Sequence, residues 1–385
     1  METKTVELIF WLFIGLCLYG YVGYPLLLIA LSPLVNRFQS LPQSTQDCPH
    51  ASILVAAYNE ENYICTKLDS LLNQHYPGEK FDIWVLNDGS SDQTATLVKS
   101  YSDPRVHLLD LPRGGKANAL NAGVKACTHD ILVFSDADNE WAPDTLMRLL
   151  APFTHTEIGA VSGHLSIRKN SRHLGMGDRL YRKYESIIRQ SETKLGSAVS
   201  ADGGIFAIRR ALYDPLPQDV TDDFFISTGA VCHGKALVYQ QSAIAYDDGV
   251  DKAENQLRRR VRVTVRGMTS LWRRRSLFNP FRFGWYSLCL LSHKLIRRFV
   301  PFFALLLLPL NVFLLTEHSF YSLSLLTQVV FYSVALAGLY DQGKRLPKVF
   351  SIASFALLSS YGLALGITKF IKGERFTFWS PEQNR

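Results

Sequence analysis

Charged residues are absent from four long stretches of this 385-residue chain. The stretches are residues 8–35, 300–316, 319–340 and 349–368. A helix needs about 20 apolar residues to cross a bilayer, with a range of about 17–25. All four stretches are long enough, the second narrowly, and a helix buried in a soluble core is usually interrupted by charge within that length. The sequence therefore predicts an integral membrane protein with spanning helices at both ends, for which the lipid bilayer is a partner.

Other features are missing as well. No small-residue cleavage site follows the first apolar stretch, so residues 1–36 are expected to be a retained anchor and not a signal peptide. The six cysteines have neither metal-ligand nor disulfide spacing, which suits a reducing compartment for the middle of the chain and argues against structural zinc. No Gly-x-Gly-x-x-Gly is present, and the one glycine loop is too short for a Walker motif.

The region between the apolar ends alternates between strand and helix patterns. Expected strands cover residues 51–57, 81–86 and 106–109, followed by the buried strand 131–134, and helical patterns lie between them. Strands and helices that alternate at this spacing are typical of βαβ units. We therefore expect an α/β fold with a mostly parallel sheet and flanking helices, in which the nucleotide-binding half ends near residue 150.

Two carboxylates, Asp136 and Asp138, stand at alternate positions where the strand that begins at Ile131 stops. Ligands of open α/β sheets bind at the carboxyl ends of the strands. Two converging carboxylates repel each other unless a cation lies between them. Mg²⁺ or Mn²⁺, with phosphate oxygens completing its coordination, suits such ligands. The pattern predicts a metal site, and a solvated acidic loop is the alternative.

Two further residues have the chemistry to bind a nucleotide. Asp88 follows the strand 81–86, and its carboxylate can accept a hydrogen bond from the imide of a uracil base; helix capping in this turn is the alternative. Lys116 follows two glycines, so that backbone N–H groups and a cation are offered together to a diphosphate.

Asp222 and Asp223 form a second acidic pair at an expected helix start. A carboxylate within hydrogen-bond reach of a sugar or lipid hydroxyl is a competent general base. Adjacent residues cannot both face one substrate from a helix start, so one is expected to act and the other to cap or support. An ordinary helix N-terminus, where acidic residues are common, is the alternative.

A basic stretch runs from residue 256 to residue 275. Arginine pairs bidentately with phosphate, and a departing diphosphate needs positive charge. A basic helix on anionic lipid headgroups is the alternative, especially for Arg273, Arg274 and Arg275. We expect no nucleic-acid partner, because the basic residues lie beside membrane segments and few aromatic residues interleave with them.

Taken together and in order, these motifs resemble those of the membrane-bound family-2 glycosyltransferases. The matching segments are residues 57–60, 87–92, 115–121, 136–138, 221–223 and 256–260. The resemblance covers roughly residues 50–275. It implies a GT-A fold, an inverting mechanism, a nucleotide-sugar donor and a divalent metal. The expected donor is a UDP-sugar. It also implies that Asp88 contacts the base, Asp138 binds the metal and Asp136 supports the nucleotide or ribose.

Two motifs depart from the family pattern. The family's Thr-Glu-Asp appears as Thr221-Asp222-Asp223, and its final residue is the base, which assigns that role to Asp223. The family's Gln-x-x-Arg-Trp is matched at Gln256 and Arg259, but Arg260 stands in place of the Trp. In processive synthases such as cellulose and hyaluronan synthases that Trp contacts the acceptor sugar. Its absence favours a transferase that adds a single sugar.

The predicted site divides into four groups. The catalytic residues are Asp223 and its neighbour Asp222. The donor-binding residues are Ala57, Tyr58, Glu60, Asp88, Lys116, Asp136, Gln256, Arg259 and Arg260. The metal ligands are Asp138 and Asp136, and the acceptor loop is Asp202, Gly203 and Gly204. The expected function is sugar transfer in cell-envelope glycan or glycolipid synthesis, to a membrane-associated or glycan acceptor. A processive polysaccharide synthase and a non-enzymatic membrane scaffold are the alternatives.

The expected organisation is an anchor at 1–36, a cytoplasmic GT-A domain at 50–275, an interfacial amphipathic helix at 281–298, membrane helices at 299–371 and a tail at 372–385. Lys344, Arg345 and Lys348 favour a cytoplasmic loop after the third apolar stretch. A fourth span would then place the basic residues at 369–375 outside, against the positive-inside trend. Either that segment does not fully cross the membrane or the rule fails here.

Overall fold

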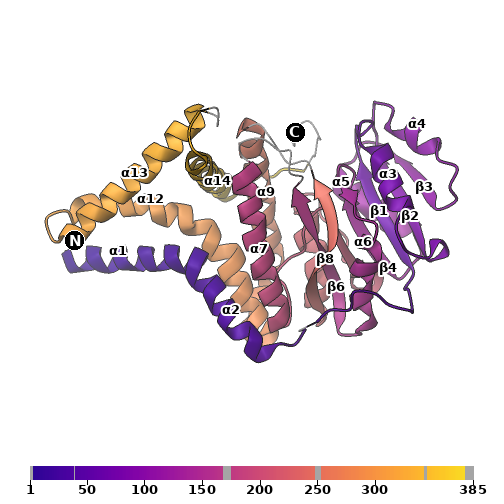
Figure 1. Ribbon diagram of the computed structural model, residues 1–385, viewed down its shortest axis with the longest axis horizontal. Coiled ribbons are helices and arrows are strands. Elements are labelled where there is room, and N and C mark those ends of the chain that lie inside the picture. The colour runs from indigo at the N-terminus through magenta and orange to yellow at the C-terminus, as the bar shows by residue number, and fades with distance from the viewer. Residues whose placement is uncertain (1–2, 39, 168–174, 248–252, 342–344, 378–385) are drawn as a thin grey trace.

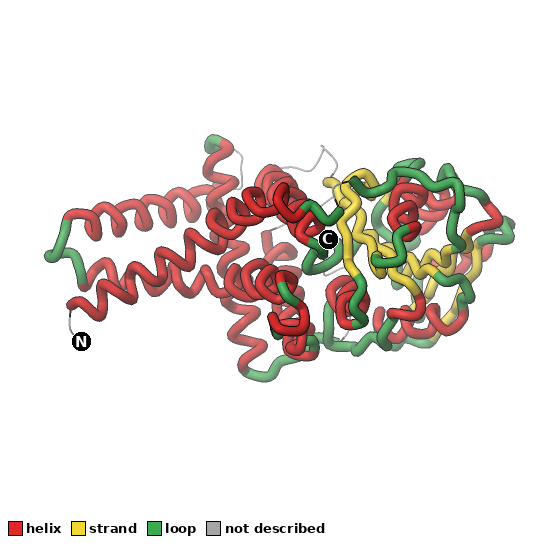
Figure 2. The backbone as a smooth tube through the Cα atoms, turned by 90° about the horizontal axis from the view of Figure 1, so that it is seen from below, coloured by secondary structure: helices red, strands yellow, loops and turns green. Residues whose placement is uncertain are grey.

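The computed structural model describes residues 3–38, 40–167, 175–247, 253–341 and 345–377. Lys344 of the expected cytoplasmic loop and residues 378–385 of the expected tail lie outside the described residues. Figure 1 shows an α/β domain on one side, a helical arm on the other, and helices α7 (Gly175–Leu195) and α9 (Ala253–Arg273) between them. The same division is seen from below in Figure 2, where the strands gather at one end.

The sheet has eight strands in the order β3-β2-β1-β4-β7-β6-β8-β5. Their bounds are β1 Ala51–Ala57, β2 Phe81–Asp88, β3 Val106–Leu111, β4 Ile131–Asp136, β5 Glu140–Trp141, β6 Ile158–Ile167, β7 Ile205–Arg209 and β8 Ala236–Asp247. β1 to β4 pair in parallel, as does β6 with β8, whereas β7 runs antiparallel to both of its neighbours. The prediction of a mostly parallel sheet is confirmed, and β7 and the short β5 make it mixed.

Helices cover both faces of the sheet. The remaining ones in the α/β domain are α3 Ile64–Leu72, α4 Thr94–Lys99, α5 Lys116–Ala126, α6 Thr145–Leu150 and α8 Asp222–Cys232, with short 3₁₀ turns at Gly78–Lys80, Ala151–Thr154, Arg210–Leu212 and Arg275–Phe278. Alternate residues of β1 enter opposite cores: Leu54 packs in one, Ile53 and Val55 in the other. A strand covered on both faces needs apolar residues at every position, which explains the continuous apolar runs of the sequence.

The first apolar stretch forms one helical column from Thr3 to Val35. It consists of α1 (Thr3–Leu18), a π-helical turn η1 (Tyr19–Gly23) and α2 (Tyr24–Val35). Near residue 280 the short α10 (Pro280–Phe283) precedes a second column built from α11 (Trp285–Leu290), π-helical η6 (Leu291–Ile296) and α12 (Arg297–Phe313). The helix does not end at the expected boundary between residues 298 and 299. The amphipathic segment and the apolar stretch after it form one column from Trp285 to Phe313, which is long and apolar enough to cross a membrane.

Two further apolar helices follow, α13 (Ser319–Asp341) and α14 (Lys348–Ile371). Both also have the length and composition of a membrane span, as does the N-terminal column. The start of α13 lies beside the start of α1, where the Tyr321 hydroxyl donates to Glu7 at 3.2 Å. The N-terminus and the α12–α13 connection thus share the outer tip of the arm (Figure 1), and α13 returns from there.

α14 packs against the amphipathic helix α9 through two glycines four residues apart. A Cβ at Gly362 would lie 2.8 Å from the Arg260 side chain, and one at Gly366 would lie 2.5 Å from Thr264. Small residues at this spacing let two helices approach closely. Beyond α14 the chain continues along the α/β domain, because Arg375 lies 4.0 Å from Asp219 and the Thr377 carbonyl lies against Gly115. The second half of α14 and the residues after it therefore rest on the α/β domain.

Candidate active site

The carboxyl ends of β1, β2 and β4 meet at one edge of the sheet. The register places Ala56 beside Asp136 and Ala57 beside Asn87. A cavity of about 320 Å³ opens at this edge, and we call it the donor cleft. Of the predicted residues, those that line it are Glu60, Lys116, Asp136, Asp138, Asp202, Gly203, Gly204, Asp222, Asp223 and Arg259. Residues far apart in the sequence thus meet in one cleft.

A buried lysine that the sequence analysis missed donates hydrogen bonds to the residues that flank the Asp-x-Asp turn. Asp136 is the last residue of β4, and Asp138 follows in the turn. The buried Lys67 ammonium donates to Ser135 Oγ at 2.6 Å and to Asn139 Oδ1 at 2.8 Å, on either side of the two aspartates. Burial lowers the pKa of Lys67 to about 7, although the charges of Asp136 and Asp138 act in the opposite direction.

Lys116 connects the Asp-x-Asp turn to the second acidic pair. Its ammonium lies 2.7 Å from Asp136 Oδ1 and 2.6 Å from Asp222 Oδ2. Burial opposes its charge, but the two carboxylates outweigh burial and raise the pKa of Lys116 above its ordinary value. Gly115, which precedes it, has φ +90°, a conformation that suits glycine. A fixed cation thus stands between the aspartates of β4 and α8.

Asp88 is buried, 2% exposed, and its carboxylate is already engaged. It accepts hydrogen bonds from the backbone N–H groups of Gly114 at 2.7 Å and Gly115 at 3.0 Å, and it pairs with Arg113. The Arg113 guanidinium in turn lies 3.5 Å from the ring centre of Tyr58. In this arrangement Asp88 positions the loop that carries Lys116. Its contact with a base stays a prediction, and Ala57, Tyr58 and Asp88 do not line the cleft.

The two adjacent carboxylates at the start of α8 have opposite pKa shifts. Burial works against ionisation of Asp222, but Lys116 and Arg266 outweigh it and hold the pKa of Asp222 below its ordinary value. Burial, together with the charge of Asp222, raises the pKa of Asp223. A carboxylate with a raised pKa is the stronger proton acceptor. Of the two carboxylates, Asp223 is therefore the better proton acceptor, and its role as the base, with Asp222 in support, stays a prediction.

The loop of residues 202–204 lies between the Asp-x-Asp turn and Asp223. Ser135 and Asn139 both donate to the Gly204 carbonyl, at 3.1 and 3.0 Å. A Cβ at Gly203 would lie 3.8 Å from the Asp223 carboxyl, so the absence of a side chain leaves room in front of that carboxyl. Asp202 itself is paired with Arg189 at 2.9 Å. The loop lines the cleft beside Asp223, and its role in acceptor binding stays a prediction.

Helix α9 divides its predicted residues between two cavities. Arg259 lines the donor cleft together with Arg262 and Arg266, which follow it at helical spacing. Gln256 and Arg260 line a second cavity on the neighbouring face, and Arg259 borders both. The motif 256–260 is thus one surface of α9 that faces two adjoining spaces, and only Arg259 of the motif reaches the donor cleft.

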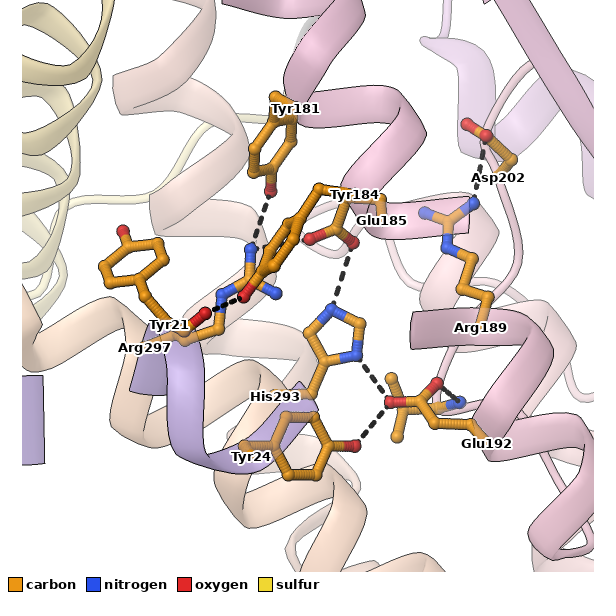
Figure 3. Close-up of polar contacts among 11 residues, drawn as sticks. Tyr21, Tyr24, Tyr181, Tyr184, Glu185, Arg189, Glu192, Asp202, His293 and Arg297 are labelled. Atoms are coloured by element: carbon orange, nitrogen blue, oxygen red, sulfur yellow. Dashed lines mark hydrogen bonds and ion pairs between the residues drawn. The ribbon is translucent and has the colours of Figure 1, made fainter. Parts of the chain in front are cut away.

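A buried polar network joins the N-terminal column to the α/β domain, and the sequence analysis missed it (Figure 3). His293 of η6 lies 2.6 Å from Glu192 and 3.0 Å from Glu185, both on α7. Tyr24 of α2 donates to the same oxygen of Glu192 at 2.6 Å, and Arg297 lies 2.5 Å from Glu185. The sequence signal that could have drawn attention to this network is the presence of His293 and Arg297 in the mostly apolar segment Trp285–Phe313. The network fixes α7 against both helical columns.

The donor cleft also fits a divalent metal. Asp136 and Asp138 offer hard oxygen ligands at its wall, and Mg²⁺ or Mn²⁺ commonly takes one or two carboxylates with substrate phosphates and water completing its coordination. Among the described residues no group of three or more His, Cys, Asp or Glu side chains could hold an ion alone. Two carboxylates alone would leave most of the coordination of such an ion to water or to a phosphate.

Comparison with known proteins decides the family of this region. The sequence model named "Glycosyl transferase family 2" matches residues 52–216, which include β1 to β4 and the Asp-x-Asp turn. Residues 52–216 form a family-2 glycosyltransferase domain. The cleft described above lies at the carboxyl edge of this domain's strands, and α8 and α9, which complete it, follow directly in the chain.

Curated relatives of the family-2 domain include bacterial polysaccharide synthases. The poly-beta-1,6-N-acetyl-D-glucosamine synthase of Staphylococcus aureus (strain MSSA476) is 32% identical over 204 residues, 51% of this chain and 49% of the relative. The enzyme of the same name from Staphylococcus epidermidis is 31% identical over 223 residues, 55% of this chain and 53% of the relative. The alignments thus span about half the length of the curated relatives.

A solved structure shares the overall fold. It is the mannosyltransferase PcManGT from Pyrobaculum calidifontis, in complex with GDP-Man and Mn²⁺. Its TM-score is 0.68 at 21% identity, and the match covers 95% of this chain and 99% of that one. At this identity the likeness concerns the fold, and it extends over the helical arm as well as the domain. The predicted GT-A fold with apolar helices at both ends is confirmed.

Proposed function

We propose that the protein is a membrane-bound, inverting glycosyltransferase. It moves a sugar from a nucleotide-sugar donor, with a UDP-sugar as the first candidate, to a hydroxyl of an acceptor at the membrane surface. The observation that carries the proposal is the meeting of the Asp-x-Asp turn, Lys116 and the raised-pKa carboxylate of Asp223 in one cleft of the family-2 domain. We assign the reaction to the synthesis of a cell-envelope glycan or glycolipid.

The cleft provides each chemical requirement of a single displacement. Asp223 accepts the proton of the acceptor hydroxyl as that oxygen attacks the anomeric carbon of the donor sugar. Lys116 and the arginines of α9 lie on the wall where negative charge develops on the departing diphosphate. Asp138 and Asp136 would hold a divalent metal, which would supply Lewis-acid stabilisation of that charge. The attack comes from the side opposite the leaving group, so the anomeric configuration inverts.

A processive polysaccharide synthase is the second candidate. The curated relatives are named poly-beta-1,6-N-acetyl-D-glucosamine synthases, which favours it. Arg260 argues against it, because an arginine stands where processive relatives carry the acceptor-binding Trp. We therefore propose single addition.

The experiment is a donor panel offered to the full-length protein in lipid nanodiscs with Mg²⁺ or Mn²⁺. UDP-glucose, UDP-N-acetylglucosamine and GDP-mannose are supplied with a membrane extract as the source of acceptor, and products are sized by mass spectrometry. We expect one donor to give a product heavier than the acceptor by one sugar. A ladder of products would support the synthase instead. The absence of nucleoside diphosphate release from every donor, with extract present, would contradict the transferase proposal.

We further propose that the α/β domain is cytoplasmic and that α14 lies at the membrane surface without crossing it. α13 returns from the outer tip of the arm, and its end contacts the start of α14, where a Cβ at Gly338 would lie 2.5 Å from the Phe350 carbonyl. The other end of α14 rests on the α/β domain. Arg345 and Lys348 then share one side of the membrane with Lys369, Lys372 and Arg375, and the positive-inside trend is obeyed throughout.

Cysteine labelling tests this topology. Single cysteines replace Glu317, Lys348 or Lys372, all of them exposed, in a background without the six native cysteines. With intact cells and an impermeant maleimide, we expect Glu317→Cys to react and the other two to react only after the cells are opened. Labelling of Lys372→Cys from outside would show that α14 crosses the membrane.

A further inference from the structure

A second cavity, of about 260 Å³, lies beside the donor cleft. We call it the lateral chamber. It is enclosed by α7, α9, η6 and α14, so one wall belongs to the α/β domain and another to the apolar helices. The two cavities share Arg182, Asp202 and Arg259 in their linings. A molecule in the chamber would therefore reach toward the cleft in which Asp223 lies.

The lining of the lateral chamber is rich in positive charge. Its cationic residues are Arg182, Arg189, Arg259, Arg260 and Lys294, and its carboxylates are Glu185 and Asp202. Both carboxylates are already paired, Asp202 with Arg189 at 2.9 Å and Glu185 with Arg297 at 2.5 Å. The lining thus carries more positive charge than its own carboxylates balance.

Three of the cations lack a carboxylate partner within the described part of the chain. Neither Lys294 nor Arg259 lies within 4.0 Å of a described carboxylate. Arg260 donates to the Ser359 hydroxyl at 3.3 Å and lies 5.8 Å from the ring centre of Tyr181. The three cations are half-buried, and removing positive charge even partly from water without a counter-charge costs free energy, so this arrangement favours an anionic occupant. Arginine and lysine side chains that line one cavity suit a phosphate.

Part of the chamber lining is apolar. α14 contributes Phe355 and Leu358, and α9 contributes Val263. Lys294 comes from the column Trp285–Phe313, which has the length and composition of a membrane span. An occupant with an anionic head and an apolar body would match both walls and could enter from the bilayer. A soluble anion would use only the cationic wall.

We propose that the lateral chamber binds the phosphate or diphosphate group of a lipid-linked acceptor. Lys294 and Arg260 hold the anionic group, Phe355 and Leu358 contact the first part of the lipid chain, and the acceptor hydroxyl extends past Asp202 toward Asp223. This names the acceptor class of the transferase and rests on the proposed function. It also gives Arg260 a role at the position where processive relatives carry Trp.

Binding of farnesyl diphosphate, a short lipid diphosphate, to the full-length protein in detergent micelles tests the proposal without turnover. Arg260→Gln and Lys294→Gln are compared with Arg258→Gln, a matched change on the same helix whose side chain is 64% exposed and faces away from the chamber lining. We expect each chamber variant to weaken farnesyl diphosphate binding at least tenfold and the Arg258 variant to leave it unchanged. Binding of the donor nucleotide-sugar should stay within about twofold in all three.

Two probes separate the sources of the anion. Inorganic diphosphate should bind at least tenfold more weakly than farnesyl diphosphate, and farnesol should not compete. Equal binding of inorganic diphosphate would identify a free-anion site and overturn the lipid assignment, and competition by farnesol would overturn phosphate recognition. An equal loss of donor binding in Arg260→Gln would assign that arginine to the donor site. Donor turnover is measured separately, so its absence would count against the transferase and not against lipid binding.

Discussion

Replacement of Asp223 by Asn is expected to lower sugar transfer by about 10²–10⁴-fold, the usual contribution of a general base. The amide has nearly the same shape as the carboxylate but cannot accept the proton of the acceptor hydroxyl. Donor binding should change little, because Lys116 and the arginines of α9 remain in the cleft. The measurement is the initial rate of nucleoside diphosphate release in lipid nanodiscs, with donor affinity determined in parallel.

Asp222→Asn is the matched control for Asp223→Asn. Asp222 pairs with Lys116 at 2.6 Å, so its loss should weaken the placement of the lysine and reduce the rate less than loss of the base. If the order of the two effects were reversed, Asp222 would be the base.

The pH dependence gives an independent check on the same pair. The base acts when ionised, so kcat/KM should rise with pH through the pKa of Asp223. Burial and the charge of Asp222 raise that pKa, so the acidic limb should lie above the ordinary range of an aspartate. In Asp222→Asn one raising charge is gone, and the limb should move to lower pH. A limb that moves to higher pH in this variant would contradict the assignment.

Removal of divalent metal is expected to have the second large effect, a loss of about 10³-fold. A metal ion typically contributes several kcal/mol of transition-state stabilisation, and each 1.4 kcal/mol is about tenfold in rate. Treatment with a chelator should abolish turnover, and added Mn²⁺ or Mg²⁺ should restore it. Asp138→Asn should lose most of that restoration, because Asp138 is the proposed ligand.

Lys67→Met is a control variant for the proposed metal site, with a smaller expected effect than the loss of a ligand. Lys67→Met removes the hydrogen bonds that hold Ser135 and Asn139 around the Asp-x-Asp turn without removing a proposed ligand. Loss of such a supporting contact typically costs about 10–100-fold in metal affinity or activity. The metal concentration for half-maximal rate should rise accordingly. Full activity in the presence of chelator, for the wild-type protein, would exclude a metal requirement.

The sequence allowed the parallel half of the sheet and about half of the residues that line the cleft to be predicted. Strands covered on both faces must be apolar throughout, so β1 and β4 are visible as continuous apolar runs. Polar residues at the ends of such runs must gather at one edge, which is how Asp136 and Asp138 could be placed beside each other. The antiparallel pairing of β7 with β4 and β6 depends on long-range contacts that a local pattern does not record.

Other features depended on tertiary packing. A lysine in a short amphipathic helix normally points to solvent, and only the packing of α3 under β4 buries Lys67 at 1% exposure. The division of residues 256–260 between two cavities follows from the helical spacing of α9 once its neighbours are known. The apolar composition of α14 is the same for a spanning helix and for one that rests on a domain. The reason for glycine at positions 362 and 366 is visible only in the folded protein, where Gly362 contacts Arg260 and Gly366 contacts Thr264.

The anomeric configuration of the transferred sugar tests the central claim most directly. The product of the full-length protein, its metal and the active donor is isolated, and the configuration of the new linkage is read from the proton coupling of its anomeric centre by NMR. A single displacement with Asp223 as the base predicts the configuration opposite to that of the donor. Retention of the donor's configuration would require a second displacement and would contradict this account.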